Sequence, residues 1–300
     1  MKFQIVSDSS CDFQAEDIVR TKVSVVSFYV SFGDDKYYRE GKDISSEQFY
    51  QTLADHPDVF PKTSMPTIQD YMDAFLPHVK AGEPVLCICI NGSFSGSMQA
   101  ALNARAMVLD DYPEAVIHVM DSQSVTVLQG LLVEEAVRLR DAGATLEETV
   151  AALEAIRSSG HIFFTTNDLE YLSHGGRIGK AAATTGTLLN VKPLIEYYDG
   201  ELISAGIAKG RKKSLQKVLE RFRKYVERES IDLNEYRVVT GYGLDREEYA
   251  AFTDSVFALL ADMGYDLPRH GDFHISVTIG VHTGPYPIGI GIMKRADLQK

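Results

Sequence analysis

Residues 85–90, with the sequence Val-Leu-Cys-Ile-Cys-Ile, are apolar at every position. A strand that is apolar on both faces is typical of the centre of a parallel sheet, where helices cover both sides. Apolar residues recur at helical spacing over residues 68–79, before this run, and over residues 98–109, after it. Because strands and helices alternate, the first half is predicted to form a Rossmann-like α/β domain, a parallel sheet with helices on both faces.

The pattern changes near residue 160. Asp199-Gly200 separates two apolar segments and is a strong signal for a two-residue β-hairpin turn. Residues 273–281 alternate between apolar and polar side chains, which predicts a strand that ends just before His282. We therefore predict two domains in the 300 residues: an N-terminal α/β domain (1–160) and a C-terminal α+β domain (161–300) with a mainly antiparallel sheet.

Two further segments give definite expectations. Residues 23–32 alternate between apolar and polar side chains, which predicts one half-buried strand. Residues 178–189 are predicted to form a helix interrupted by Gly186.

The chain is acidic, because 42 Asp and Glu against 30 Lys and Arg give a net charge of −12. This argues against a nucleic-acid-binding surface, which needs clustered basic side chains to neutralise phosphates. The three cysteines, Cys11, Cys87 and Cys89, are odd in number and lack zinc-site spacing, so neither a disulfide framework nor a metal is expected. No stretch reaches the ~18 consecutive apolar residues of a membrane span. We expect a cytoplasmic protein without stable membrane insertion. Transient contact with a membrane remains compatible with the sequence.

Four polar segments follow predicted strands or precede predicted helices. They are Ser7-Asp8-Ser9-Ser10, Lys62-Thr63-Ser64-Met65-Pro66-Thr67, Asn91-Gly92-Ser93-Phe94-Ser95-Gly96-Ser97 and Asp121-Ser122. In open α/β sheets the ligand binds outside the carboxyl ends of the strands, so these loops are expected to converge.

The loop before the helix at residues 98–109 combines glycines with hydroxyl side chains. Free backbone N–H groups and the helix dipole at such a position suit one carboxylate or phosphate. Ordinary helix capping explains the same residues equally well. The loop is neither a Walker motif nor a nucleophile elbow, since its serines, Ser93 and Ser95, lie one place away from the position that an elbow requires.

Basic residues and one histidine in the second half are further candidates. Arg177 follows two glycines at a predicted helix start, where the helix dipole disfavours a cation that has no anionic partner. Arg211 and Lys212 open a long helix in the same way, either as a solvated face or as a docking site. His282 stands just before Gly284-Pro285, where it could reach into a cleft between the domains or be merely structural.

An enzymatic interpretation is also open. Asp8 and Asp121 could meet across the strand ends and act with Ser93 on ATP or on an ester. However, no base and nucleophile stand in a recognisable motif. A third alternative is a structural or regulatory module whose pocket is vestigial.

Taken in order, several segments resemble the DegV family of bacterial lipid-binding proteins. They are residues 6–12, Thr63-Ser64-Met65-Pro66-Thr67, Ser93-Phe94-Ser95-Gly96-Ser97, residues 120–122, residues 169–178 and His282-Thr283-Gly284-Pro285. The resemblance implies one long-chain fatty acid buried between two domains and no other cofactor. Several members resemble the acyl-carrying subunit of a bacterial fatty acid kinase, which presents the carboxylate to a separate ATP-dependent kinase subunit.

The resemblance also assigns residues. It implies that Thr63, Ser93 and His282 bind the carboxylate, and that Arg177, Arg211 and Lys212 lie at the pocket mouth or dock the kinase subunit. The supporting pocket residues that it implies are Asp8, Ser9, Ser64, Ser95 and Gly96. The sequence departs from the family at Tyr286 and Pro287, where another glycine is usual, so the Tyr286 ring is expected to affect access or tail selection.

Physical estimates agree with a carrier. Burying ~15 methylenes at ~0.8 kcal/mol each gives a gross ~12 kcal/mol, much of which association and ordering take back. A buried carboxylate must meet hydrogen-bond donors, which threonine and serine hydroxyls supply. Because such a site offers no nucleophile with its base, the chain is predicted to be a lipid carrier and not an enzyme.

Overall fold

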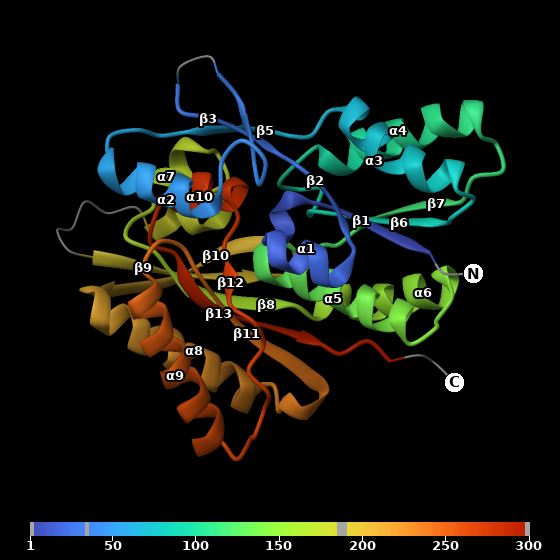
Figure 1. Ribbon diagram of the computed structural model, residues 1–300. Helices are drawn as coiled ribbons and strands as arrows, with labels where there is room; N and C mark the ends of the chain where they lie inside the picture. The colour runs from blue at the N-terminus through green and yellow to red at the C-terminus, as the bar shows by residue number, and fades with distance from the viewer. Residues whose placement is uncertain (1–2, 34–35, 185–190, 298–300) are drawn as a thin grey trace.

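The computed structural model describes residues 3–33, 36–184 and 191–297 (Figure 1). Four strands form a parallel sheet in the order β2 (Ser24–Val26), β1 (Gln4–Asp8), β6 (Val85–Cys89) and β7 (Ile117–Asp121). The apolar run is thus an interior strand, since β6 pairs with β1 on one side and with β7 on the other. The predicted parallel α/β sheet is confirmed.

Helices cover both faces of this sheet. Helices α3 (Ile68–Lys80) and α4 (Ser97–Asp111) pack on one face, and α5 (Thr126–Asp141) and α6 (Leu146–Ile156) pack on the other. Both faces of β6 are therefore buried, as its sequence predicts.

Capping boxes start two of these helices. The Thr67 hydroxyl accepts from the Asp70 N–H at 3.2 Å, while the Asp70 carboxylate accepts from the Thr67 N–H at 2.8 Å. Thr145 and Glu148 form the same reciprocal pair at the start of α6. Each box satisfies amides that a helix terminus otherwise leaves without a partner.

A six-stranded sheet occupies the second half. Its order is β10 (Glu201–Lys209), β9 (Val191–Tyr198), β8 (His161–Thr165), β13 (Ile288–Lys294), β11 (Tyr236–Tyr242) and β12 (Phe273–His274). Every neighbouring pair is antiparallel except β11 and β12. The predicted hairpin joins β9 to β10 through Asp199 and Gly200, both with positive φ. The mainly antiparallel sheet is confirmed.

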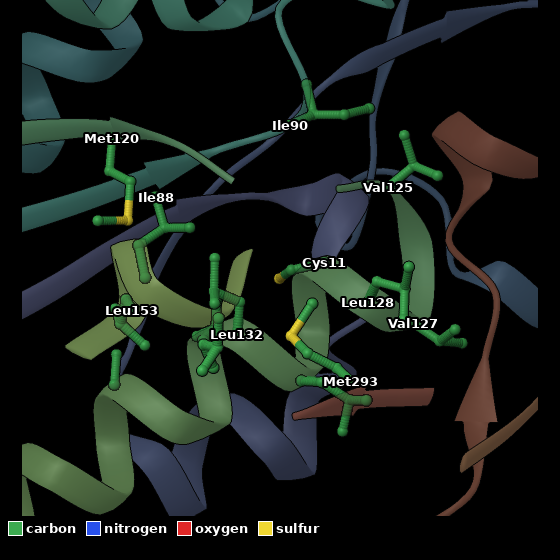
Figure 2. Close-up of a cluster of buried hydrophobic side chains, with 14 of the residues drawn as sticks. Cys11, Ile88, Ile90, Met120, Val125, Val127, Leu128, Leu132, Leu153 and Met293 are labelled. Carbon is green, nitrogen blue, oxygen red and sulfur yellow. The ribbon is translucent and has the colours of Figure 1, made fainter. Parts of the chain in front are cut away.

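Helix α5 lies between the two sheets and packs against both (Figure 1). Figure 2 shows the core that this helix shares, with Leu132 of α5 near Ile88 of β6 and Leu128 of α5 near Met293 of β13. On β11 and β13, an added Cβ at Gly241 or Gly291 would lie 2.8 Å from the Val127 methyl groups. These glycines therefore allow α5 to approach the six-stranded sheet closely.

Helices α8 (Arg211–Arg228) and α9 (Arg246–Asp262) cover the other face of the six-stranded sheet (Figure 1). All strands of the parallel sheet precede residue 160 and all strands of the six-stranded sheet follow it. The division into domains at residue 160 stays a prediction.

The smaller elements complete the described chain. They are η1 (Ser9–Cys11), α1 (Ala15–Thr21), β3 (Tyr29–Ser31), β4 (Tyr38–Arg39), α2 (Ser46–Asp55), β5 (Lys62–Ser64), η2 (Arg157–Ser159), α7 (Glu170–His174), η3 (Gly179–Thr184), η4 (Leu233–Glu235) and α10 (Val277–Thr283). Strands β4, β3 and β5 form a separate three-stranded antiparallel sheet. No helix within the described ranges is long and apolar enough to cross a bilayer.

Three element predictions need correction. The single strand expected at residues 23–32 is two strands in different sheets, because the chain turns at Phe28, whose N–H donates to the Ser9 hydroxyl. Residues 273–281 are not one strand: after β12 the chain forms α10, which is buried on almost every side, so its sequence shows no helical period. The helix expected at residues 178–189 is the 3₁₀ helix η3 as far as Thr184, and its remainder lies outside the described residues.

Candidate functional site

A cavity lies between the inner face of the six-stranded sheet, the start of α5 and helix α10. The empty space along it, with the open solvent at its mouth included, is about 1120 Å³. Most of its wall is apolar, formed by Phe28, Ile90, Phe94, Val125, Val127, Ile162, Phe164, Leu172, Leu202, Ile275, Ile279 and Ile288. Ile90, Val125 and Val127 also belong to the core in Figure 2, so the cavity continues the core rather than the surface.

The cavity runs across the strands of the sheet. Leu202 of β10 and Gly241 of β11 both line it, as do residues of the three strands between them. Four strand spacings of ~4.8 Å give a length of about 19 Å. An elongated, mostly apolar ligand suits a cavity that crosses these strands.

Polar groups gather at one end of the cavity. Thr63 of β5 and His282 of α10 line it together, with 3.4 Å between Thr63 Oγ1 and His282 Nε2. Ser95 and Gly96, just before α4, line the same cavity. The Met65 side chain lies over Gly96, where an added Cβ would be 2.8 Å from its sulfur.

Arg177 is exposed at the mouth. Its Nη1 donates to the Gly175 carbonyl at 2.7 Å, and its Nε donates to the Phe94 carbonyl at 3.3 Å. No carboxylate among the described residues forms an ion pair with it. The guanidinium charge is therefore free to face an anion at this end of the cavity.

His282 is held in a neutral state. Burial, together with the nearby charge of Arg177, lowers the pKa of His282 to about 4. Its Nδ1 is buried and has no hydrogen-bond partner within the described part of the chain. Only Nε2, on the Thr63 side, is in contact with another polar side chain.

The His282 pKa predicts a pH dependence of stability. Since the pKa of about 4 in the folded state lies below the usual ~6.5, stability is present above pH 6.5 and is lost as pH falls towards 4. Relative to His282→Gln, the wild type should lose about 2 kcal/mol of unfolding free energy between pH 7 and pH 5. Urea unfolding of both proteins at several pH values measures this difference. Equal pH slopes would show that His282 is not held neutral.

Gly175 and Gly176, the two glycines beside His282, are each required for a different structural reason. A Cβ added to Gly175 would lie 2.0 Å from His282 Nδ1, so the imidazole ring occupies the space of a side chain. Gly176 has φ +66° and open space around it, so its requirement is conformational. Gly175 therefore determines where the His282 ring can lie.

Ser93 and Ser64 do not line the cavity. Ser93 is exposed and borders two other hollows, one of which also contains Asp121 and Arg157. Ser64 is exposed next to Thr63 on β5, and successive side chains of a strand point to opposite faces. Of the two serines in the loop before α4, it is Ser95 that joins Thr63 and His282.

Asp8 and Ser9 are buried behind the cavity wall. The Asp8 carboxylate accepts from the Ile90 N–H at 3.0 Å, the Ser97 hydroxyl at 2.9 Å and the Gln129 amide at 2.9 Å. Ser9 donates to Glu40 at 2.6 Å. Neither residue lines the cavity, and both connect the loops that surround it.

The three residues of the enzymatic alternative do not share one site, because Ser93 and Asp121 border the same hollow but Asp8 does not. Asp121 accepts from the backbone N–H groups of Gly92 and Gln123, at 3.2 and 2.7 Å. Asp8 is fully buried, and Ser93 has no hydrogen bond to a basic side chain within the described ranges. No group of three or more His, Cys, Asp or Glu in the described chain could hold a metal ion.

Arg211 and Lys212 lie away from the mouth, at the start of the helix that covers the opposite face of the sheet. Arg211 forms an ion pair with Glu248 of α9 at 2.5 Å, which offsets the unfavourable position of a cation at a helix N-terminus. Lys212 is exposed. Tyr286 is half-buried and does not line the cavity, whereas Pro287 does.

Comparison with known proteins decides the family. Residues 2–295 match the profile of the DegV family, described as uncharacterised proteins. The chain belongs to the DegV family. A DegV domain-containing protein of Clostridium acetobutylicum is 30% identical over 98% of this chain and 99% of its own length.

Two solved structures are similar along the whole DegV chain. A stearic acid-binding protein from Eubacterium ventriosum is 40% identical with a TM-score of 0.92, covering 98% of each chain. A fatty acid-binding DegV protein from Thermus thermophilus is 30% identical with a TM-score of 0.85, covering 98% of this chain and all of its own. The fold described above is therefore the DegV fold.

Several residues of the site were missed by sequence reasoning. Thr126 and Thr278 line the cavity, but their hydroxyls donate to the buried carboxylates of Asp12 and Glu40. Asp12 stands inside a DegV motif that could have indicated it. Glu40 stands in a polar segment without any pattern, so no local signal could have found it.

Proposed function

We propose that this DegV-family protein binds one long-chain fatty acid in the cavity, with the carboxylate at the end formed by Thr63 and His282. The observation that carries the proposal is the division of the cavity wall: a mostly apolar surface that crosses five strands, with hydroxyls, an imidazole and a guanidinium at one end. An amphiphile with a single anionic head matches that division. Structurally similar family members are described as stearic acid-binding and fatty acid-binding.

The proposed head-group contacts are Thr63, Ser95 and His282, with Arg177 at the mouth. Ser95 takes the place that the family resemblance gave to Ser93, because Ser95 lines the cavity and Ser93 does not. A neutral His282 donates one hydrogen bond through Nε2–H, while its Nδ1 packs against Gly175. Hydroxyl, imidazole and guanidinium donors together offset the cost of taking a carboxylate out of water.

Replacing Ser95 tests the head-group assignment. We expect Ser95→Ala to weaken binding of palmitate to delipidated protein by about tenfold, since a hydrogen bond to a charged group is lost. Isothermal titration calorimetry measures the dissociation constant. Ser93→Ala is the matched control, with a change below about twofold. The reverse result, a loss with Ser93→Ala alone, would return the carboxylate to Ser93.

The finer part of the proposal is that the carboxylate is presented to a separate ATP-dependent kinase subunit, which forms an acyl phosphate. The head-group end supports this, because Arg177 and Met65 are exposed at the rim and the hollow outside it is bordered by Lys180 and Glu201. We therefore place the docking surface at this rim and not at Arg211, because the Arg211 charge is already paired with Glu248.

Charge reversal distinguishes the two docking surfaces. Lys180 is 69% exposed and pairs with Glu201 beside the mouth. We expect Lys180→Glu to slow acyl-phosphate formation with a cognate kinase several-fold, without changing palmitate affinity, since rim charges act mainly on association rates. Lys212→Glu, on the opposite side of the sheet, should leave the rate unchanged. A loss with Lys212→Glu alone would move the docking surface to α8.

We assign no catalytic residue to the chain itself. The alternative enzyme needs Asp8, Ser93 and Asp121 in one site, and Asp8 is instead buried among four donors behind the wall. The proposal also includes enclosure of the tail between two domains divided at residue 160, and a cytoplasmic location in which the carrier exchanges fatty acid during transient membrane contact.

A further inference from the structure

Helix α10 forms much of the cavity wall. Thr278, Ile279, His282 and Thr283 all line the cavity from this one element. The helix has only seven residues, and isolated helices shorter than ~12 residues are unstable in water. The direction of the His282 ring therefore depends on whatever fixes the helix from outside.

Two distant carboxylates hold the start of α10. The Ser276 N–H donates to Asp12 at 2.8 Å, and the Thr278 N–H and hydroxyl donate to Glu40 at 3.3 and 2.6 Å. Glu40 also accepts from the Val277 N–H. Both acids are more than 230 residues away in the sequence.

The local cap residue is not used. Ser276 stands at the N-cap position, where a serine side chain normally accepts from the helix amides. Its hydroxyl makes no cap bond and instead interacts with the Asp12 carboxyl, whose pKa it lowers against the effect of burial. Glu40 and Asp12 have taken over the capping of α10.

The same two carboxylates also hold the opposite wall of the cavity. Glu40 accepts from the Ser9 hydroxyl at 2.6 Å, and Ser9 in turn accepts from the N–H of Phe28, a wall residue, at 3.0 Å. Asp12 accepts from the hydroxyl of Thr126, which is also a wall residue. Each acid thus connects α10 to a wall segment from the first half of the chain.

Neither acid has a cationic partner within the described chain, so hydrogen bonds and the helix dipole alone stabilise their charges. Burial raises the pKa of both carboxyls to about 7, against the opposing effect of those hydrogen bonds. A buried carboxylate with several donors is costly to neutralise or remove, because the donors are then left without partners.

We propose that Glu40 and Asp12 are positioning residues, which clamp α10 between the two halves of the cavity wall and so aim His282 at the ligand head group. This inference rests on the proposed function. Glu40 makes no ligand contact of its own; it acts through the orientation of His282.

A double-mutant cycle tests the coupling. Glu40→Gln should weaken palmitate binding to delipidated protein about tenfold, because an amide nitrogen replaces an acceptor in front of the Thr278 N–H. In a His282→Ala background the same change should lower palmitate affinity less than about twofold, because the side chain that Glu40 orients is absent. An equal loss in both backgrounds, or no loss in either, would overturn the inference.

A matched control separates positioning from general stability. Glu135 is another buried carboxylate, which accepts the Ala296 N–H at 2.9 Å, is ion-paired with Arg138 and Arg237, and does not line the cavity. Glu135→Gln should lower stability but leave palmitate affinity unchanged. If it weakened binding as much as Glu40→Gln, loss of stability would explain both and the inference would fail.

Two further arms keep the test decisive. If Glu40→Gln does not fold, Asp12→Asn replaces it in the same double-mutant cycle. A milder loss of palmitate affinity, a few-fold, is expected, because the amide oxygen of Asn can still accept the Ser276 N–H.

The ring ¹⁵N signals of His282 in ligand-free protein should shift in either variant and not in Glu135→Gln. Unshifted signals would count against a positioning role. A wild type that binds no palmitate would refute the proposed function itself, whereas a His282→Ala defect with a normal Glu40→Gln would refute only this inference.

Discussion

Gly175→Ala should weaken fatty acid binding on the order of 100-fold. The new methyl group would lie 2.0 Å from His282 Nδ1, so the imidazole must leave its place beside Thr63. The backbone of Gly175, at φ −73° and ψ −10°, suits alanine, so the cost to the unfolding free energy should be limited to the displacement of the buried ring, about 1–3 kcal/mol. Calorimetric titration with palmitate and urea unfolding measure the two effects.

The neighbouring glycine is the matched control for Gly175. Gly176→Ala places a side chain in the left-handed region, at φ +66°, with nothing within 4 Å. It should cost about 1 kcal/mol of stability and leave palmitate affinity unchanged. Should Gly175→Ala bind like the wild type, or Gly176→Ala bind as weakly as Gly175→Ala, the role of His282 in head-group binding would be refuted.

Asp8→Ala should lower the unfolding free energy by roughly 3–5 kcal/mol. Its carboxylate is fully buried and accepts hydrogen bonds from Ile90, Ser97 and Gln129, so removal leaves several buried donors without an acceptor. Those donors join β1, β6, α4 and α5, so the loss affects the whole parallel sheet. Chemical denaturation at constant pH measures the change.

Asp121→Ala is the control for Asp8. Asp121 is half-buried at the end of β7 and accepts two backbone N–H groups from exposed residues, where water can replace it, so about 1 kcal/mol is expected. The enzymatic alternative predicts instead that both substitutions abolish an activity while leaving stability similar. An Asp8→Ala protein as stable as Asp121→Ala would contradict the structural role given to Asp8.

Regular patterns in the sequence were enough to predict the two sheets. The apolar strand at β6, the capping boxes at Thr67 and Thr145, and the Asp199-Gly200 turn each carry their signal in a few neighbouring residues. Residue chemistry singled out the segments of Thr63, Arg177 and His282, and the family resemblance suggested their roles; the structure brings all three to one end of the cavity.

The remaining features depend on tertiary contacts. Helix α10 alternates like a strand in sequence, yet it is a helix because Asp12 and Glu40 cap it from the other half of the chain. Ser93 and Ser95 are equivalent in sequence, and only the course of the loop decides which one lines the cavity. The partner of Arg211 is on a different helix, so its charge looked free in the sequence.

The central claim is that the cavity holds a long-chain fatty acid. Native mass spectrometry of the protein purified from bacteria tests it most directly, with Gly175→Ala purified in parallel. We predict that the wild type carries one added mass equal to that of a long-chain fatty acid, that this mass disappears on delipidation, and that Gly175→Ala retains little of it. A wild-type protein that carries no such mass, and takes up none when palmitate is added, would contradict the account.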